Sequence, residues 1–179
     1  EQPASDSKAI LGGKGLGLCE MSKLGIPVPP GLVITTDVCR HFMNHGGALP
    51  DGLIAEVEKA LAWVGEKTGA RFGDVERTLL VSVRSGARVS MPGMMDTVLN
   101  LGLNDQAVET LARSSGNPRF AYDAYRRFVQ MFGDVVLGMK PEHKNEIDPF
   151  EAILDKKKEA HHVHLDTELS ADALRELVA

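Results

Sequence analysis

Hydrophobic side chains recur at helical spacing in two long stretches of the chain. In the first, apolar residues stand three or four positions apart from Leu53 to Val64, and Gly69 marks an end. In the second, Asn117 and Pro118 form a cap and first-turn pair. The pattern predicts a helix over 53–69 and a longer helix with a buried face that carries Ala121, Tyr125, Phe128, Phe132 and Val136.

Shorter patterns complete the expected secondary structure. Two more helices are predicted at 148–160 and 170–179, and β-patterned runs predict strands at 79–84, 97–102 and 32–36. Thr36 is expected to cap a helix that Gly46 and Gly47 close. Residues 12–25 are expected to form a glycine-rich turn that leads into a short helix ending at Gly25.

These elements divide the chain by type. Strand patterns occur only up to about residue 103, and the remainder is helical. The sequence therefore predicts an α+β chain with a mixed region over 1–103 and a helical region over 104–179.

Composition restricts the class of protein without identifying it. The chain has 179 residues and is 43% hydrophobic, so we expect it to form a folded core. Because its net charge is −5, we do not expect it to bind nucleic acid. We expect no membrane association, because no apolar run reaches the length of a membrane span and the start is unlike a signal peptide. Cys19 and Cys39 are interpreted as free thiols of a cytoplasmic protein, or of an organellar protein whose targeting segment has been removed.

The stretch GGKGLG, residues 12–17, has the composition of an anion-binding turn. It matches neither the P-loop nor the dinucleotide-binding pattern, because Lys14 is followed by Gly15 and the glycine spacing differs. Glycines nevertheless let backbone amides approach an anion, a following helix adds its dipole, and Lys14 adds charge. A flexible glycine turn without a ligand is the alternative.

A second cationic position lies at the end of a predicted strand. Arg84 ends the run LLVSVR and is followed by a loop that carries hydroxyl, carboxylate and arginine groups. An arginine presents a fork of donors suited to phosphate oxygens. Together with Lys14 it predicts a polyphosphate clamp, and surface salt bridges of Arg84 and Arg88 are the alternative.

Four segments resemble the N-terminal nucleotide-binding domain of the pyruvate, phosphate dikinase family. They are ILGGKG, GIPVPPGLVITT, LLVSVRSGARVSMPGMMDTVLNLGLND and GNPRFAYDAYRRFVQMFGDVV. The resemblance implies the first lobe of an ATP-grasp-like domain with an attached helical subdomain. The sister enzyme phosphoenolpyruvate synthase has a similar Val-Arg-Ser core but lacks the Met-Pro-Gly-Met-Met continuation, and it is the closest alternative.

The resemblance also implies a reaction and a set of site residues. The family interconverts ATP, pyruvate and phosphate with AMP, phosphoenolpyruvate and diphosphate through a histidine on a swinging domain, and the full-length enzyme is expected to be a homodimer. Lys14 and Arg84 are implied to be catalytic, and the loop from Gly86 to Asp96 is implied to be a mobile cover over ATP. Magnesium ligands and the phosphohistidine are expected outside this chain. The implied nucleotide-binding residues are Gly12, Gly13, Gly15, Ser85, Met95, Asp96 and Thr97.

Other polar groups support no site from sequence alone. His41 and His45 have a spacing compatible with zinc, but no third ligand accompanies them, and a cluster at 161–164 stands in a polar linker. DKKKEA is interpreted as a solvated helix face. The arginines of the long helix are interpreted either as surface groups or as part of a cleft or docking face; they are Arg119, Arg126 and Arg127. A non-catalytic helical interaction module remains an alternative function, favoured if Lys14 and Arg84 point to opposite faces.

Overall fold

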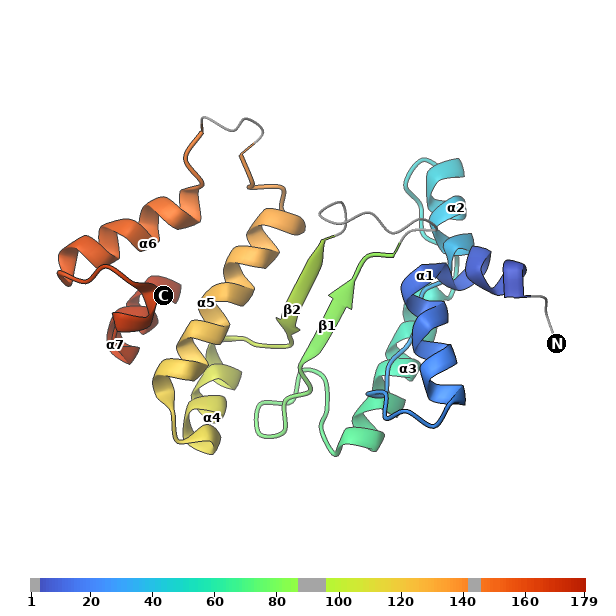
Figure 1. Ribbon diagram of the computed structural model, residues 1–179, viewed down its shortest axis with the longest axis horizontal. Helices are drawn as coiled ribbons and strands as arrows, with labels where there is room; N and C mark the ends of the chain where they lie inside the picture. Colours follow the sequence, from blue (N-terminus) through green and yellow to red (C-terminus); the bar gives the residue numbers. More distant parts are fainter. Residues whose placement is uncertain (1–3, 87–95, 142–145) are drawn as a thin grey trace. The chain divides into compact units, whose positions relative to one another are not determined.

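A computed structural model describes residues 4–86, 96–141 and 146–179 (Figure 1). The chain divides into two compact units. The first comprises Glu1–Phe72 and Arg84–Asp96, and the second comprises Gly73–Val83 and Thr97–Ala179. Helices and a small two-stranded sheet together give an α+β chain, as predicted.

The described part of the first unit contains three helices, α1 (Ala4–Lys23), α2 (Thr36–Asn44) and α3 (Leu53–Thr68). α3 has the predicted extent, because Gly69 adopts a left-handed conformation and its N–H caps the carbonyl of Gly65. α1 starts before the glycine-rich stretch, and that stretch is not the turn expected from sequence. Only Gly12 leaves the helical conformation, with φ 68° and ψ 174°, so the glycines mark a kink inside a helix.

Two expectations about the segment before α2 are wrong. Residues 32–36 form no strand, because an extended segment becomes one only when a neighbour takes up its backbone hydrogen bonds, and none of the described residues does so. Thr36 is the first helical residue rather than the cap, which is Thr35. The Thr36 hydroxyl instead donates to the carbonyl of Ala9 at 2.6 Å and ties α2 to α1.

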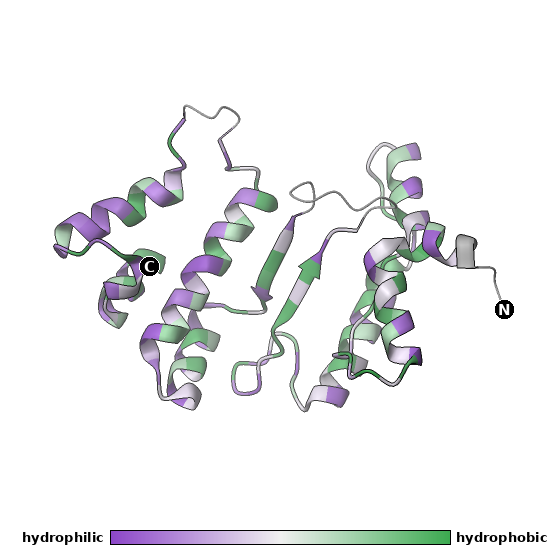
Figure 2. Ribbon diagram, in the orientation of Figure 1, coloured by the Kyte–Doolittle hydropathy of each residue, from purple (hydrophilic) through white to green (hydrophobic). Residues whose placement is uncertain are grey.

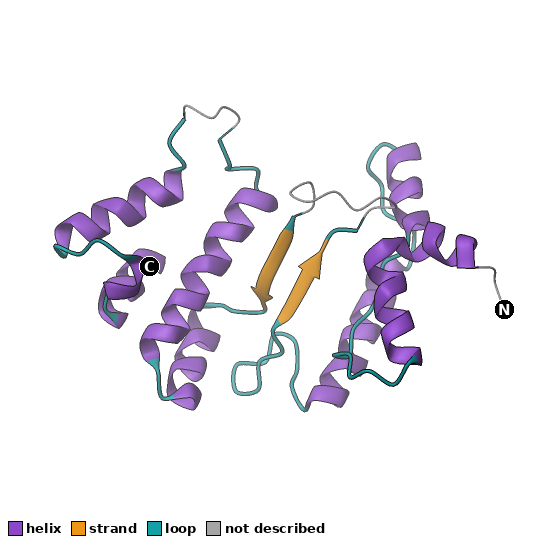
Figure 3. Cartoon of the chain, viewed as in Figure 1, coloured by secondary structure: helices purple, strands orange, loops and turns teal. Residues whose placement is uncertain are grey.

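The sheet consists of β1 (Val81–Arg84) and β2 (Thr97–Leu101), which pair as an antiparallel hairpin (Figures 1 and 3). Both strands fall inside the predicted runs. Leu79, immediately before β1, and Val98 in β2 are each 5% exposed, whereas Val83 is half exposed. The buried positions anchor the hairpin to the second unit.

The remaining regular secondary structure in the described part of the second unit is helical, with loops between the helices, as Figure 3 shows. Asn117 accepts from the N–H of Phe120 and Pro118 begins α5, so the predicted cap is confirmed. Val136 follows the end of α5 and is 54% exposed, so it does not belong to the buried stripe as expected. The elements are α4 (Asp105–Ser115), α5 (Pro118–Val135), α6 (Pro149–Ala160), the short 3-10 helix η1 (Asp166–Glu168) and α7 (Ala171–Val178).

The core of the second unit lies where α5 packs on α4 and α7. Ala121 and Leu174 are fully buried, and Leu169 and Val108 are nearly so. The amphipathic colouring of α5 in Figure 2 agrees with this arrangement, because green and purple alternate along the helix. Hydrophobic burial between these three helices is therefore the main stabilising contribution in this unit.

Charged residues of α6 are more enclosed than the sequence indicates. The Lys158 ammonium contacts Asp155 at 2.8 Å and Asp166 at 3.2 Å, and its side chain is only 19% exposed. Lys157 pairs with Glu176 of α7 and is similarly enclosed. The interpretation of DKKKEA as a solvated face is wrong for these two lysines, because acidic groups from η1 and α7 draw them inward.

The arginines of α5 are held by contacts within the second unit. Arg119 donates to the carbonyls of Leu169 and Asp166, at 3.0 and 2.8 Å. Arg126, only 12% exposed, contacts Asp123 at 3.1 Å, and Arg127 contacts the same carboxylate at 3.0 Å. None of the described helices is long and apolar enough to cross a membrane.

Candidate functional site

The kink at Gly12 creates a new helix start within α1. A positive φ at this position suits glycine, which pays no Cβ penalty there. Gly13, Lys14 and Gly15 then form the first turn of the continuing helix, where backbone N–H groups lack intrahelical acceptors. The local structure therefore keeps the anion-binding character expected of this stretch, with a helix start in place of a turn.

Gly15 allows a close approach to the extended segment before α2. Gly15 is buried, and a Cβ atom built there would lie 3.2 Å from one methyl group of Val33 and 3.3 Å from the other. A larger residue would push α1 away from this segment. The glycine content of residues 12–17 thus has a packing reason besides any role toward a ligand.

Lys14 lies beside the end of β1. Its ammonium donates to the backbone carbonyl of Ser85 at 2.9 Å, across 71 residues of sequence. Arg84 is the last residue of β1 and immediately precedes Ser85. The two cationic residues singled out from sequence are therefore carried by segments that meet within the first unit.

Ser85 closes the base of the loop that follows β1. Its hydroxyl donates to the carbonyl of Asp96 at 3.0 Å, and its N–H donates to the same oxygen at 3.2 Å. Asp96 is exposed and Thr97, the first residue of β2, is half-buried. Met95 and the loop residues 87–95, including most of the expected ATP cover, lie outside the described residues.

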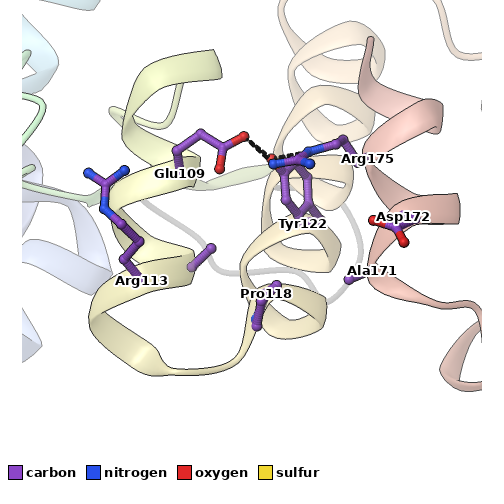
Figure 4. Close-up of a pocket in the computed structure, with 8 residues that line it drawn as sticks. Glu109, Arg113, Pro118, Tyr122, Ala171, Asp172 and Arg175 are labelled. Carbon is purple, nitrogen blue, oxygen red and sulfur yellow. Dashed lines mark hydrogen bonds and ion pairs between the residues drawn. The ribbon is translucent and has the colours of Figure 1, made fainter.

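The structure also contains a polar cluster that sequence reasoning missed. Arg175 of α7 donates to the Tyr122 hydroxyl at 2.7 Å and to Glu109 of α4 at 2.6 Å, and Tyr122 donates to the same carboxylate (Figure 4). The guanidinium also lies 5.0 Å from the centre of the Tyr122 ring. Tyr122 and Glu109 precede Arg175 by 53 and 66 positions and meet it only in the folded unit. No sequence spacing therefore indicates the cluster.

A pocket of about 330 Å³ lies beside this cluster, between α4, α5 and α7 (Figure 4). Hydrogen bonding by Tyr122 and Arg175 lowers the pKa of Glu109, and burial, aided by Glu109, raises the pKa of Tyr122. The Glu109 carboxylate and the Arg175 guanidinium thus balance each other's charge and hydrogen bond to each other. We interpret the cluster as a polar connection between three helices.

The other tyrosine gives a pH-dependent prediction. Burial, reinforced by a hydrogen bond to Asp105 at 2.7 Å, raises the pKa of Tyr125 to about 12. The folded value exceeds the unfolded value of about 10, so this stabilisation is complete below pH 10 and is lost as pH rises through 12. We expect the free energy of unfolding to fall by about 2–3 kcal/mol from this group over that window.

Denaturant titrations at a series of alkaline pH values measure this fall. Tyr125→Phe keeps the ring in the core and removes the titrating hydroxyl. It should therefore reduce the dependence of the free energy of unfolding on pH. If the ultraviolet signal of ionised Tyr125 appears near pH 10 while the chain is still folded, the assignment is wrong.

Comparison with known proteins matches the first part of the chain to a nucleotide-binding domain. Residues 8–51 match the family model described as "Pyruvate phosphate dikinase, AMP/ATP-binding domain". That region includes Gly12, Lys14 and the segment that packs on Gly15.

Curated relatives extend the match to nearly the whole chain. It is 51% identical to pyruvate, phosphate dikinase of Clostridium symbiosum over 99% of its length, and 52% identical to that of Entamoeba histolytica over 96%. A chloroplastic pyruvate, phosphate dikinase of Arabidopsis thaliana is 53% identical over 96% of the chain. The chain spans 20%, 19% and 17% of these three relatives. The family resemblance is confirmed: the chain is homologous to pyruvate, phosphate dikinases and corresponds to a fragment of their N-terminal, AMP/ATP-binding domain.

Proposed function

We propose that this chain forms part of the ATP-binding site of a phosphotransferase. The full-length protein would interconvert ATP, pyruvate and phosphate with AMP, phosphoenolpyruvate and diphosphate. The observation that carries the proposal is the contact of Lys14 with Ser85, which brings the helix start after Gly12 and the end of β1 together. The matched AMP/ATP-binding domain and the names of the relatives support the nucleotide.

Lys14 and Arg84 are proposed as the catalytic cations. A transferring phosphoryl group spreads negative charge over its oxygens, so positioned cations stabilise the transition state more than they stabilise bound ATP. The exposed Lys14 ammonium is at present paired with a neutral carbonyl. It can exchange that weak partner for a phosphate oxygen at little cost, since a charged acceptor gives a stronger hydrogen bond.

The remaining proposed contacts surround these two cations. Backbone N–H groups of the first turn after Gly12 would approach phosphate oxygens, and the loop from Gly86 to Asp96 would cover them. Magnesium would bridge the phosphates through ligands outside this chain. The proposed nucleotide-binding residues are Gly12, Gly13, Gly15, Ser85, Met95, Asp96 and Thr97.

Architecture and partners follow the same proposal. Residues 1–103 would be the first lobe of an ATP-grasp-like domain, and 104–179 its helical subdomain. The phosphoryl acceptor would be a histidine on a swinging domain of the same polypeptide, in a homodimeric enzyme. We propose a cytoplasmic location or a plastid, since the relatives include chloroplastic proteins.

Titration of the chain with magnesium ATP tests the proposed site. We expect amide NMR shifts to change most at Gly13–Gly15 and at Ser85, with a dissociation constant on the order of a millimolar or weaker. Binding is weak because the metal ligands and the adenine-binding wall are expected elsewhere in the polypeptide. No phosphoryl transfer is expected from the chain alone.

Matched variants of one helix sharpen this test. Lys14→Gln removes a charged contact and should weaken binding about tenfold, whereas Lys23→Gln, at the exposed end of α1, should leave it unchanged. Shift changes confined to the second unit, or equal effects of the two variants, would contradict the proposed site. Micromolar affinity would show that the site is complete within 179 residues.

A further inference from the structure

The two histidines at the end of α2 form a compact pair. Their ring centres lie 3.9 Å apart with an angle of 11° between the ring planes. His45 is exposed, and His41 is half-buried. The two imidazole rings are therefore stacked on each other at the surface, and His45 is the more accessible of the two.

A backbone hydrogen bond fixes which nitrogen of His45 is available. Its Nδ1 lies 2.8 Å from the carbonyl oxygen of His41, and a carbonyl can only accept, so Nδ1 carries the proton. The lone pair of the neutral ring is therefore on Nε2, on the opposite side. Histidines that bind metals are oriented in this way, with the second nitrogen donating to a carbonyl or carboxylate.

The position in the helix also favours a cation. His41 is in the last turn of α2 and His45 follows it, where unpaired carbonyls give the helix end a partial negative charge. Asp37 lies one turn before His41 but is already paired with Arg40. At this position the described residues therefore offer two histidine ligands and no third side chain. The described part of the chain contains no larger cluster of metal-binding side chains.

We propose that His41 and His45 bind a divalent transition-metal ion that prefers imidazole, with water completing its coordination. Zn²⁺, Ni²⁺ and Cu²⁺ have this preference, whereas Mg²⁺ prefers oxygen ligands and keeps its water. Metal–nitrogen bonds of about 2.0–2.1 Å require the in-plane lone pairs of the two rings to converge, so metal binding would rotate the rings out of their parallel stack. The site is distinct from the proposed magnesium ATP site, because neither histidine belongs to that set.

Calorimetric titration with Zn²⁺, Ni²⁺, Cu²⁺ and Mg²⁺ chlorides tests this site. Other metal-binding groups are removed in a background variant in which both cysteines become serine and the remaining histidines become glutamine. These positions are Cys19, Cys39, His143, His161, His162 and His164. We expect this background to bind one Cu²⁺ most tightly, to bind Ni²⁺ and Zn²⁺ more weakly, and to show no heat with Mg²⁺.

Single variants in this background identify the ligands. His41→Gln and His45→Gln should each weaken Zn²⁺ binding at least about tenfold, and Asn44→Gln on the same turn should have no effect. Binding unchanged in both histidine variants, or absent from a folded background, would overturn the proposal.

NMR of the unaltered chain provides a check that does not depend on the substitutions. The ring protons of His41 and His45 should be the first histidine signals to shift as Zn²⁺ is added. Earlier shifts of the 161–164 cluster would place the preferred ion there and would also overturn the proposal.

Discussion

Leu174→Ala should destabilise the chain by about 3–5 kcal/mol, the upper range for a core leucine. Leu174 lies in α7, is 0% exposed, and belongs to the core that α7 forms with α5. The loss includes the burial of the removed carbon atoms and the cavity that remains, since the fully buried Ala121 and the nearly buried Leu169 of the same core leave little freedom to collapse. Urea titration followed by circular dichroism measures it.

Leu165→Ala is the matched control. Leu165 belongs to the same unit but is 61% exposed, so the same change in chemistry should cost well under 1 kcal/mol. Similar costs for the two variants would mean that α7 is not packed as described. A change in midpoint without a change in slope would confirm that both variants unfold in the same way.

The helices that sequence predicts best are those with both a boundary signal and a periodic face. α5 has Asn117 and Pro118 at its start and a row of apolar residues, so both its existence and its start are predictable. The hydrophobic pattern does not indicate α4, although Asn104 caps it and Gly116 ends it with a left-handed conformation. Its buried residues are mostly alanines, which give a weaker hydrophobic pattern than the aromatic residues of α5.

The errors arise where structure depends on partners distant in sequence. A β-pattern at 32–36 does not specify a neighbour, and no described residue pairs with it. Thr36 has the chemistry of a cap, but its hydroxyl donates to the carbonyl of Ala9, on a helix whose first half the sequence pattern does not indicate. The enclosure of Lys158 requires Asp166, which sequence alone does not place near it.

In the candidate site, too, some features can be predicted from the sequence and others only from the structure. The chemistry of Lys14 and Arg84 is visible in sequence, because glycines and a strand end single them out. That the segments carrying them meet is visible only in the structure, through the contact between Lys14 and Ser85 within the first unit. The cluster of Glu109, Tyr122 and Arg175 has no local signal at all and required the fold.

If the proposed function holds for the full-length protein, Arg84→Ala should abolish nearly all ATP-dependent phosphorylation of the proposed acceptor histidine. Removing a positioned cation from a phosphoryl-transfer site costs about 1,000-fold or more, because the developing charge loses a bidentate donor. The pyruvate half-reaction should persist, since this chain is proposed to serve only ATP. Arg71→Ala, at an exposed position of the same unit, should leave both half-reactions intact.

Isotope exchange followed separately for each half-reaction of the full-length Arg84→Ala protein tests the proposed function most directly. We expect label exchange between AMP and ATP to be lost while exchange between pyruvate and phosphoenolpyruvate continues at the rate of the unaltered protein. Loss of both exchanges, or retention of both, would contradict the assignment of this chain to the ATP site.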